Sequence, residues 1–366
     1  MPKQQKNICL RKIGRLEGRS IKNRIDGKAH WGYVLGKACE EVDRKLKGAN
    51  CDRTSSFSAL SDEWLLLRAP QLKASSIAKY RNLLDLYLLP AFENMPAAGI
   101  SRADLIQWSR MLLTSGGKKA KGLAPKTVNC ALSLMRNILE FASRERELPA
   151  ADTKGIFVKQ PQKPMRILSR AEQQRLSDYL RENLTPCNMG ILLCLYTGLR
   201  IGEICALLWE DILMEEQCLY IHCTMQRIQV KEHTGKRTEV VILPPKSDCS
   251  IRRIPIPYEI HRLLLPMQRQ GKAFLLTGMA HSYVEPRNME NRFKAVCKSC
   301  GILDVHFHAL RHTFATRCVE LGFDARSLSE ILGHASVNIT LNRYVHPSME
   351  LKQKNMNMLS ELLTAK

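Results

Sequence analysis

The sequence predicts a multidomain fold: a small α+β domain at the N-terminus, then an all-α domain, then a mainly α domain of α+β type. Its 366 residues are enough for two or three domains. Residues 48–54 and 150–164 lack the periodicity of helices and strands, and the second stretch is rich in proline. We expect both stretches to be linkers between the three domains.

Residues 1–50 are expected to form the small α+β domain. Their apolar pattern predicts three short strands, at 8–12, 19–24 and 30–35. Asp26 followed by Gly27 is a typical hairpin turn, and the pattern at 37–47 predicts a helix. A disordered basic tail is the alternative, and the Trp and Tyr of the third strand argue against it.

Residues 55–148 are expected to form the all-α domain. Apolar residues at helical spacing predict four helices, at 57–67, 73–87, 101–114 and 124–144. Ser101 followed by Asp104 is a typical helix start, and so is Pro125. Residues 115–122 contain three glycines and three lysines, which predicts a flexible basic loop.

Residues 165–347 are expected to form the third domain. Ser169 and Glu172 have the spacing of a helix capping box. Runs rich in β-branched residues at 218–230 and 240–256 predict a small sheet. After this domain, residues 348–366 carry Met and Leu at helical spacing and predict a tail helix, which could pack on its own domain or on another copy of the chain.

The charge of the chain indicates a polyanionic partner. Lys and Arg number 56 against 35 Asp and Glu, a net charge of +21. Nucleic acid is the simplest such partner, and a merely solvated basic surface is the alternative. No apolar run approaches the ~20 residues of a membrane span, and no secretory signal is recognisable. We therefore expect a soluble, cytoplasmic protein.

The thirteen cysteines predict reduced thiols and no metal site. Cys297 and Cys300 have the spacing of zinc ligands, but such sites normally need a second pair. Cys218 and Cys223 flank His222 within a predicted strand, where neighbouring side chains point to opposite faces.

The segment from His308 to Tyr344 carries groups suited to phosphodiester chemistry. Arg311 can neutralise a phosphate through two parallel hydrogen bonds. His308 and His334 can move protons or donate hydrogen bonds near neutral pH. Tyr344 can act as a covalent nucleophile. These side chains together indicate a reaction at a phosphate.

Two upstream residues extend this set. Arg200 lies between apolar runs, so it is expected at the edge of a core, where Glu203 is a plausible partner. Polar residues around Lys246 separate two runs rich in β-branched residues, which predicts a hairpin with Lys246 near its tip. Lys231 and Lys236 are alternatives to this lysine, and His306 and His312 are alternatives to His308.

The order of these residues resembles the active-site set of the tyrosine recombinases, the phage integrase family. That pattern is Thr-Gly-x-Arg-x-x-Glu, a hairpin lysine, His-x-x-Arg, Leu-Gly-His, and a tyrosine about ten residues later. The matching residues here are Arg200, Lys246, His308, Arg311, His334 and Tyr344. The N-terminal domain is most like the arm-type DNA-binding domain of conjugative-transposon and phage integrases.

The resemblance implies a DNA-cleaving mechanism without ATP, divalent metal or other cofactor. Tyr344 would attack the phosphorus and form a 3′-phosphotyrosyl link. Arg200, Arg311 and His334 would bind the phosphate. Lys246 would protonate the leaving 5′-oxygen, and His308 would assist removal of the proton from Tyr344. Glu203 would brace Arg200.

The resemblance also implies how DNA is bound. Residues 55–148 would be a SAM-like core-binding domain, residues 165–347 the catalytic domain, and four protomers would assemble on double-stranded attachment sites. A directionality factor is a possible further partner. The expected phosphate contacts, each equally compatible with an ordinary surface residue, are Lys73, Ser75, Ser76, Lys79, Lys126 and Thr127.

Integration and excision of a mobile element, phage or conjugative transposon, is the function that the sequence predicts. One alternative is a catalytically silent DNA-binding accessory protein. Another is a relaxing enzyme similar to type IB topoisomerases, which would not need the N-terminal domain.

Overall fold

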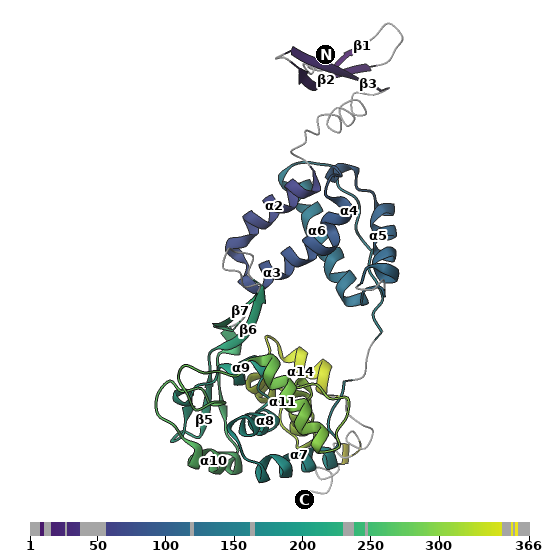
Figure 1. The fold of residues 1–366 in the computed structure, drawn as a ribbon. Coiled ribbons are helices and arrows are strands. Elements are labelled where there is room, and N and C mark those ends of the chain that lie inside the picture. Colours follow the sequence, from purple (N-terminus) through teal and green to yellow (C-terminus); the bar gives the residue numbers. More distant parts are fainter. Residues whose placement is uncertain are drawn as a thin grey trace, which may run out of the picture. The chain divides into compact units, whose positions relative to one another are not determined.

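The chain forms two compact units, Met1–Gln162 and Lys163–Lys366 (Figure 1). The structure is a computed structural model. Of the three N-terminal strands it describes the backbone, and beyond them it describes residues 56–117, 121–161, 165–229, 238–245, 248–345, 353 and 356–357.

The three strands predicted near the N-terminus form one antiparallel sheet in the order β1-β2-β3. Its strands are β1 (Ile8–Leu10), β2 (Leu16–Ile25) and β3 (Lys28–Gly36). The register of β2 against β3 shifts between Ile21 and Asn23, as at a β-bulge. The predicted turn at 26–27 and the predicted helix at 37–47 lie outside the described residues.

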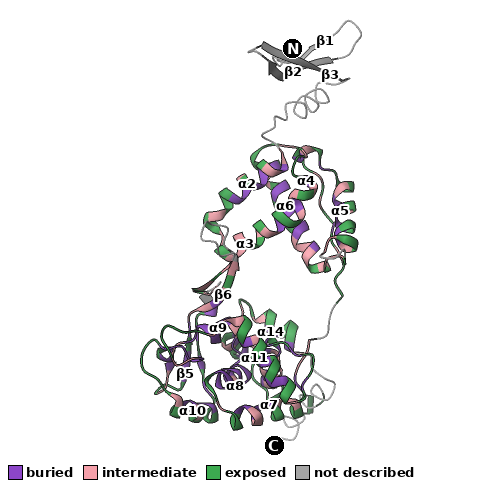
Figure 2. Cartoon of the chain, in the orientation of Figure 1, coloured by how far each residue is buried: buried purple, intermediate pink, exposed green. Residues whose placement is uncertain are grey.

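Between residues 56 and 145 the described part of the first unit is mainly helical, as predicted. Its helices are α2 (Phe57–Arg68), α3 (Ala74–Leu83), α4 (Leu89–Phe92), α5 (Arg102–Ser115) and α6 (Pro125–Glu145). A π-helical segment, Leu84–Leu88, joins α3 to α4. The face of α6 that contains Val128, Met135 and Ile138 is buried in the core (Figure 2). Ser101 and Asp104 form a capping box at the start of α5.

The stretch after α6 has no regular secondary structure, but its described part packs on the helices. The side chain of Arg102 donates to the carbonyls of Asp152 and Lys154, at 2.8 and 2.7 Å. Asn129 donates to the carbonyl of Val158 and accepts from its backbone N–H, at 2.7 and 2.8 Å. The backbone of this stretch is thereby held against α5 and α6 by hydrogen bonds to the side chains of Arg102 and Asn129.

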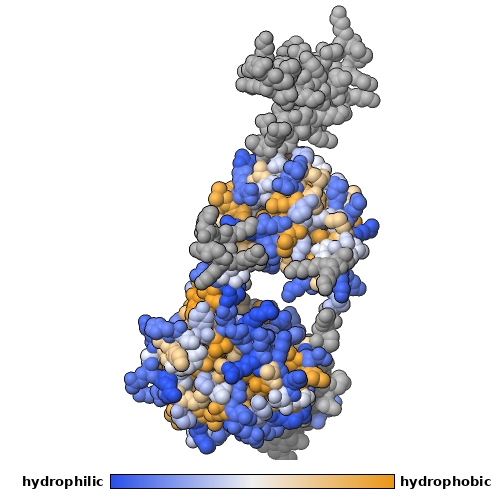
Figure 3. Space-filling model, in the orientation of Figure 1, coloured by the Kyte–Doolittle hydropathy of each residue, from blue (hydrophilic) through white to orange (hydrophobic). Residues whose placement is uncertain are grey.

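The second unit packs its helices around α8 (Pro186–Thr197), which is buried on nearly all sides. Apolar and small residues occupy almost every position of α8, and this all-round pattern is typical of a central helix. The other helices are α7 (Arg170–Glu182), α9 (Ile201–Ala206), α10 (Tyr258–Leu264), α11 (Pro286–Ser299), α12 (His308–Glu320), α13 (Ala325–Leu332) and α14 (Val337–Tyr344). Hydrophilic residues cover most of the visible surface of this unit (Figure 3).

The sheet of the second unit differs from the prediction. Strands β4 (Ile212–Leu213), β5 (Cys218–Ile221) and β8 (Arg252–Pro255) form one sheet, whereas β6 (Thr224–Gln229) pairs with β7 (Thr238–Leu243). The hairpin predicted with Lys246 near its tip was therefore wrong, because β7 and β8 pair with different partners. Lys246 falls in the connection between them, outside the described residues. Strand periodicity shows which residues are extended, but not which strands pair.

Among the described residues, no helix is both long enough and apolar enough to cross a membrane. The tail helix predicted at 348–366 lies mostly outside the described residues. Gln353, Met356 and Asn357 are described there, and they are helical.

Asn129→Ala should lower the free energy of unfolding of the first unit by roughly 1–3 kcal/mol, because two backbone groups of Val158 lose their partner. Denaturant unfolding followed by tryptophan fluorescence would measure the loss. Ser133→Ala, on the same helix at an exposed site, is the matched control and should change little. Equal stability of the two variants would contradict the role of Asn129.

Candidate active site

Arg200 is positioned by a sharp turn between α8 and α9. Gly198 ends α8 with φ of 68°, in the left-handed region. A Cβ there would lie 2.5 Å from a ring carbon of Phe314, so glycine is required for both conformation and space. Arg200 follows as the N-cap residue of α9, and its backbone N–H donates to Glu203 at 2.9 Å.

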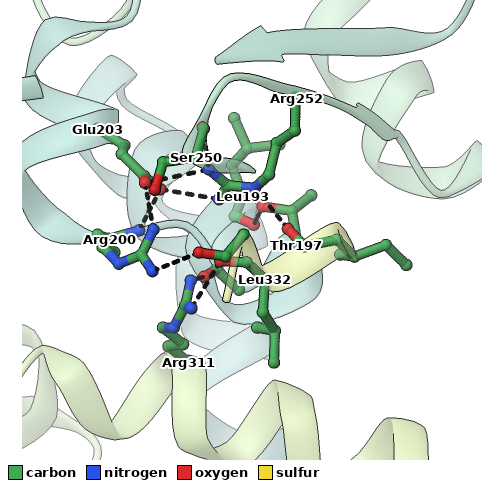
Figure 4. Close-up of polar contacts among 11 residues, drawn as sticks. Leu193, Thr197, Arg200, Glu203, Ser250, Arg252, Arg311 and Leu332 are labelled. Carbon is green, nitrogen blue, oxygen red and sulfur yellow. Dashed lines mark hydrogen bonds and ion pairs between the residues drawn. The ribbon is translucent and has the colours of Figure 1, made fainter. Parts of the chain in front are cut away.

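Glu203 lies between two guanidinium groups (Figure 4). Its carboxylate accepts from Arg200 Nη1 at 2.7 Å and from Arg252 Nη1 and Nη2 at 3.1 and 3.0 Å. Burial would raise the pKa of Glu203, but the hydrogen bonds and charge of Arg252 and the charge of Arg200 lower it overall. Glu203 is therefore an anion that holds two cations in place.

Three arginines also converge on the C-terminal end of α13. Arg252 Nε donates to the carbonyl of Ile331 at 2.6 Å, and Arg311 Nη2 to that of Leu332 at 2.7 Å. Arg200 Nη2 donates to the carbonyl of Gly333, the residue after α13, at 3.1 Å. The last carbonyls of a helix lack partners within it and carry the negative end of its dipole, so they favour cations. We call Arg200, Arg252, Arg311 and Glu203 the arginine cluster.

Arg311 is the most buried member of this cluster, with 2% of its surface exposed. Its Nη1 also donates to the carbonyl of Gly198 at 2.8 Å, which joins α12 to the turn that precedes Arg200. Burial, followed by the charge of Arg200, lowers the pKa of Arg311 to about 9. The guanidinium is therefore still charged at neutral pH.

Arg252 was not among the residues singled out from the sequence. In the strand β8, Arg252 and Ile254 are buried and the residues after each are exposed. Arg252 thus occupies an inward position although it is charged. A charged residue in an inward position of a strand needs a buried partner. That signal was present in the sequence, but the partner, Glu203, is 49 residues away along the chain.

Tyr344 ends α14 with 5% of its surface exposed. Its hydroxyl lies 2.9 Å from Nδ1 of His312, and its ring stacks on His334 with centroids 6.3 Å apart. Nδ1 of His334 lies 2.8 Å from the hydroxyl of Thr340. The structure thus brings Tyr344 together with two histidines from different elements.

His308 begins α12, one turn before His312, and its ring meets that of His312 edge-on at 4.5 Å between centroids. The residue is exposed, although its ring is partly shielded from solvent. His306 points elsewhere, because its Nδ1 lies 3.7 Å from Glu290 and 82% of its side chain is exposed. His306 is therefore the weakest of the three candidates for a contact with Tyr344.

Burial and the arginines lower the pKa of the active-site histidines. The pKa of His312 falls to about 4 through burial and the neighbouring His308, Arg343 and Arg311. The pKa of His334 also falls to about 4, through burial and then Arg311 and Arg200. His308 shows the same shift. Burial raises the pKa of Tyr344, which the charges of Arg311 and Arg343 oppose.

The remaining candidates lie either outside the described residues or in the first unit. Lys246, Lys231 and Lys236 lie outside the described residues. The expected phosphate contacts belong to the first unit. Lys73, Ser75 and Ser76 lie at the N-terminal end of α3, Lys79 in its middle, and Lys126 and Thr127 at the N-terminal end of α6. The three lysines are exposed and the other three residues are partly buried.

Arg252→Ala should lower the free energy of unfolding of the second unit by roughly 3–5 kcal/mol, because Glu203 loses its bidentate partner. Denaturant titration would measure this loss. Arg253→Ala is the matched control, since Arg253 pairs with Glu216 on the surface and should contribute about 0–1 kcal/mol. A loss below 1 kcal/mol for Arg252→Ala would refute the bracing role.

The stability of the second unit should fall as pH drops from about 6.5 toward about 4. His312 and His334 have folded pKa values near 4 against an ordinary 6.5, so the unfolded chain binds protons more readily in this range. Unfolding at a series of pH values would show it. Replacing both with Asn should make this dependence shallower, whereas exposed His281→Asn should leave it unchanged.

Two family models match the chain. Residues 166–350 match the phage integrase family, and residues 56–113 match the N-terminal SAM-like domain of phage integrases. The ICEBs1 integrase of Bacillus subtilis strain 168 is 23% identical over 351 residues, which cover 89% of this chain and 90% of the relative. A tyrosine recombinase XerC-like protein of Caldanaerobacter subterraneus subsp. tengcongensis is 26% identical over 269 residues, 66% of this chain and 68% of the relative.

Solved structures share the fold. The Tn1549 transposon integrase in complex with a circular intermediate DNA aligns with a TM-score of 0.67 and 20% identity, over 83% of this chain and 99% of that one. A lambda integrase tetramer bound to a Holliday junction aligns with a TM-score of 0.55 and 14% identity, over 92% and 97%. With one family model covering half of its length, the chain belongs to the phage integrase family and is a tyrosine recombinase.

Proposed function

We propose that this enzyme integrates and excises a mobile genetic element by site-specific recombination. The observation that carries the proposal is that Tyr344 packs in one cluster with Leu332, whose carbonyl binds Arg311 of the arginine cluster, and that the charge of Arg311 acts on its phenol. The cluster holds three guanidinium groups against one carboxylate, so it carries a net positive charge. Such a site binds and stabilises a phosphate whose charge increases during the reaction.

In the proposed reaction, Tyr344 attacks a DNA phosphate, and a 5′-hydroxyl leaves. The 3′-phosphotyrosyl ester keeps the bond energy, so a 5′-hydroxyl of another strand can reverse the attack without ATP. Arg200 and Arg311 bind the non-bridging oxygens. Each guanidinium has five N–H donors, and the carbonyl and carboxylate contacts described above use two on each side chain.

The other groups complete the acid–base chemistry. His334 donates a further hydrogen bond to the phosphate, and Lys246 protonates the leaving 5′-oxygen. A histidine of α12 takes the proton of Tyr344, a role that the family resemblance gives to His308. Glu203 and Arg252 keep Arg200 in position.

The proposed domain roles follow the order of the chain. Residues 1–50 bind arm-type DNA sites, residues 55–148 bind the core site, residues 165–347 carry out catalysis, and residues 348–366 form a tail helix. The ICEBs1 integrase aligns over 89% of this chain, against 75% for a XerD recombinase of Rickettsia bellii, which favours the integrase role. Four protomers on DNA attachment sites in a bacterial cytoplasm, with a possible directionality factor, complete the proposal.

Wild-type protein should form a covalent adduct with the 3′ end of nicked duplexes from the DNA that flanks the gene, in the presence of EDTA. Tyr344→Phe should form none, because the nucleophilic oxygen is absent. Tyr258→Phe, at an exposed tyrosine of the same unit, should behave like wild type. A denaturing gel separates adduct from free DNA.

Each other outcome supports a different reading. DNA binding without an adduct on any duplex would favour a catalytically silent accessory protein. Relaxation of supercoiled plasmid without strand exchange between two sites would favour an enzyme similar to type IB topoisomerases. An adduct that persists in Tyr344→Phe would mean that another tyrosine is the nucleophile.

A further inference from the structure

The hydroxyl of Tyr344 is in hydrogen-bond contact with a histidine, and that histidine is His312. The distance from its Nδ1 to the hydroxyl oxygen is 2.9 Å, within the range expected of a general base and its proton. The two rings are 5.7 Å apart and tilted by 50°. Because His312 lies directly after Arg311 on α12, the same helix turn presents a phosphate-binding group and a proton acceptor.

We propose that His312, and not His308, is the catalytic residue that accepts the proton of Tyr344. This proposal rests on the proposed function and assigns one step of it. The Oη–H bond breaks and an Nδ1–H bond forms on His312, while the oxygen lone pair forms the bond to phosphorus. The bond from phosphorus to the 5′-oxygen breaks, and the general acid gives that oxygen a proton.

The neighbours of His312 make it competent for this role. To accept through Nδ1, the neutral ring must carry its proton on Nε2. The charged and titratable groups that face it are His308 and Arg311 on α12, and Arg343 and Tyr344 on α14. Burial, and then His308, Arg343 and Arg311, disfavour the imidazolium, so the ring is neutral before DNA binds. A bound phosphate brings negative charge that offsets the arginines as the proton arrives.

His308 acts differently in this arrangement. It lies four residues before His312, so the two rings occupy the same face of the helix. Its ring packs edge-on against that of His312, and no hydrogen bond to Tyr344 is seen for it among the described contacts. We therefore assign His308 to orienting the ring of His312, as a positioning residue.

The test measures single-turnover cleavage of a nicked duplex that traps the phosphotyrosyl intermediate. His312→Asn keeps an acceptor near the position of Nδ1 but cannot take the proton, and His312→Ala removes both. Each should slow cleavage by roughly 10²–10⁴-fold, the usual contribution of a general base. His308→Asn should slow it less than either, and gel shifts of all variants should show unchanged DNA binding.

Religation and rescue separate a proton acceptor from a structural role. Since the same group returns the proton to the leaving tyrosine, the His312 variants should slow religation by the same factor as cleavage. Fluorotyrosine at position 344 has a more acidic phenol and should restore much of the rate of His312→Ala. It should not restore the rate of Arg311→Lys, which loses phosphate binding instead.

A measurement on the wild-type protein covers the case in which the variants fail to fold. The nitrogen chemical shifts of His312 should report an unprotonated Nδ1 and a protonated Nε2. The opposite tautomer would overturn the proposal, as would near-normal cleavage by His312→Asn, or a loss in His312→Ala that fluorotyrosine does not rescue. Absence of any wild-type adduct would instead refute the proposed function.

Discussion

The active site depends on one constraint, the burial of several like charges beside each other. Two of the three guanidinium groups bind one carboxylate, and all three can stay together only because backbone carbonyls also accept from their N–H groups. Glu203 supplies two of the accepting oxygens and the last carbonyls of α13 supply three. Each of these carbonyls would lack a partner at a free helix end, so helix and arginines satisfy each other.

This arrangement links elements that are distant in the sequence. Arg200 is the N-cap residue of α9, Arg252 lies in β8 and Arg311 lies in α12, and all three contact the end of α13. The backbones of α9 and β6 also lie close together in this part of the unit. A Cβ at Gly202 would lie 2.5 Å from the hydroxyl oxygen of Thr224, so β6 can approach α9 closely because residue 202 is glycine. The positive site is therefore built into the packing of the unit rather than added to its surface.

The nucleophile is held by a different set of contacts. Tyr344 packs in a small apolar cluster with Leu328 and Leu332, while its hydroxyl contacts His312. The ring is thus fixed by apolar packing and the oxygen by a polar group. Burial favours the protonated phenol in this position, and the charges of Arg311 and Arg343 reduce the cost of forming its anion.

The sequence by itself determined the family, the helices of residues 57–145 and the capped start of α7, because these follow from local periodicity, capping and motif spacing. It did not determine that β7 and β8 belong to different sheets, that Arg252 shares Glu203 with Arg200, or that His312 contacts the tyrosine. Strand pairing, buried ion pairs and side-chain contacts depend on residues far apart in the chain. Only the tertiary structure brings such residues together, so only the tertiary structure could decide them.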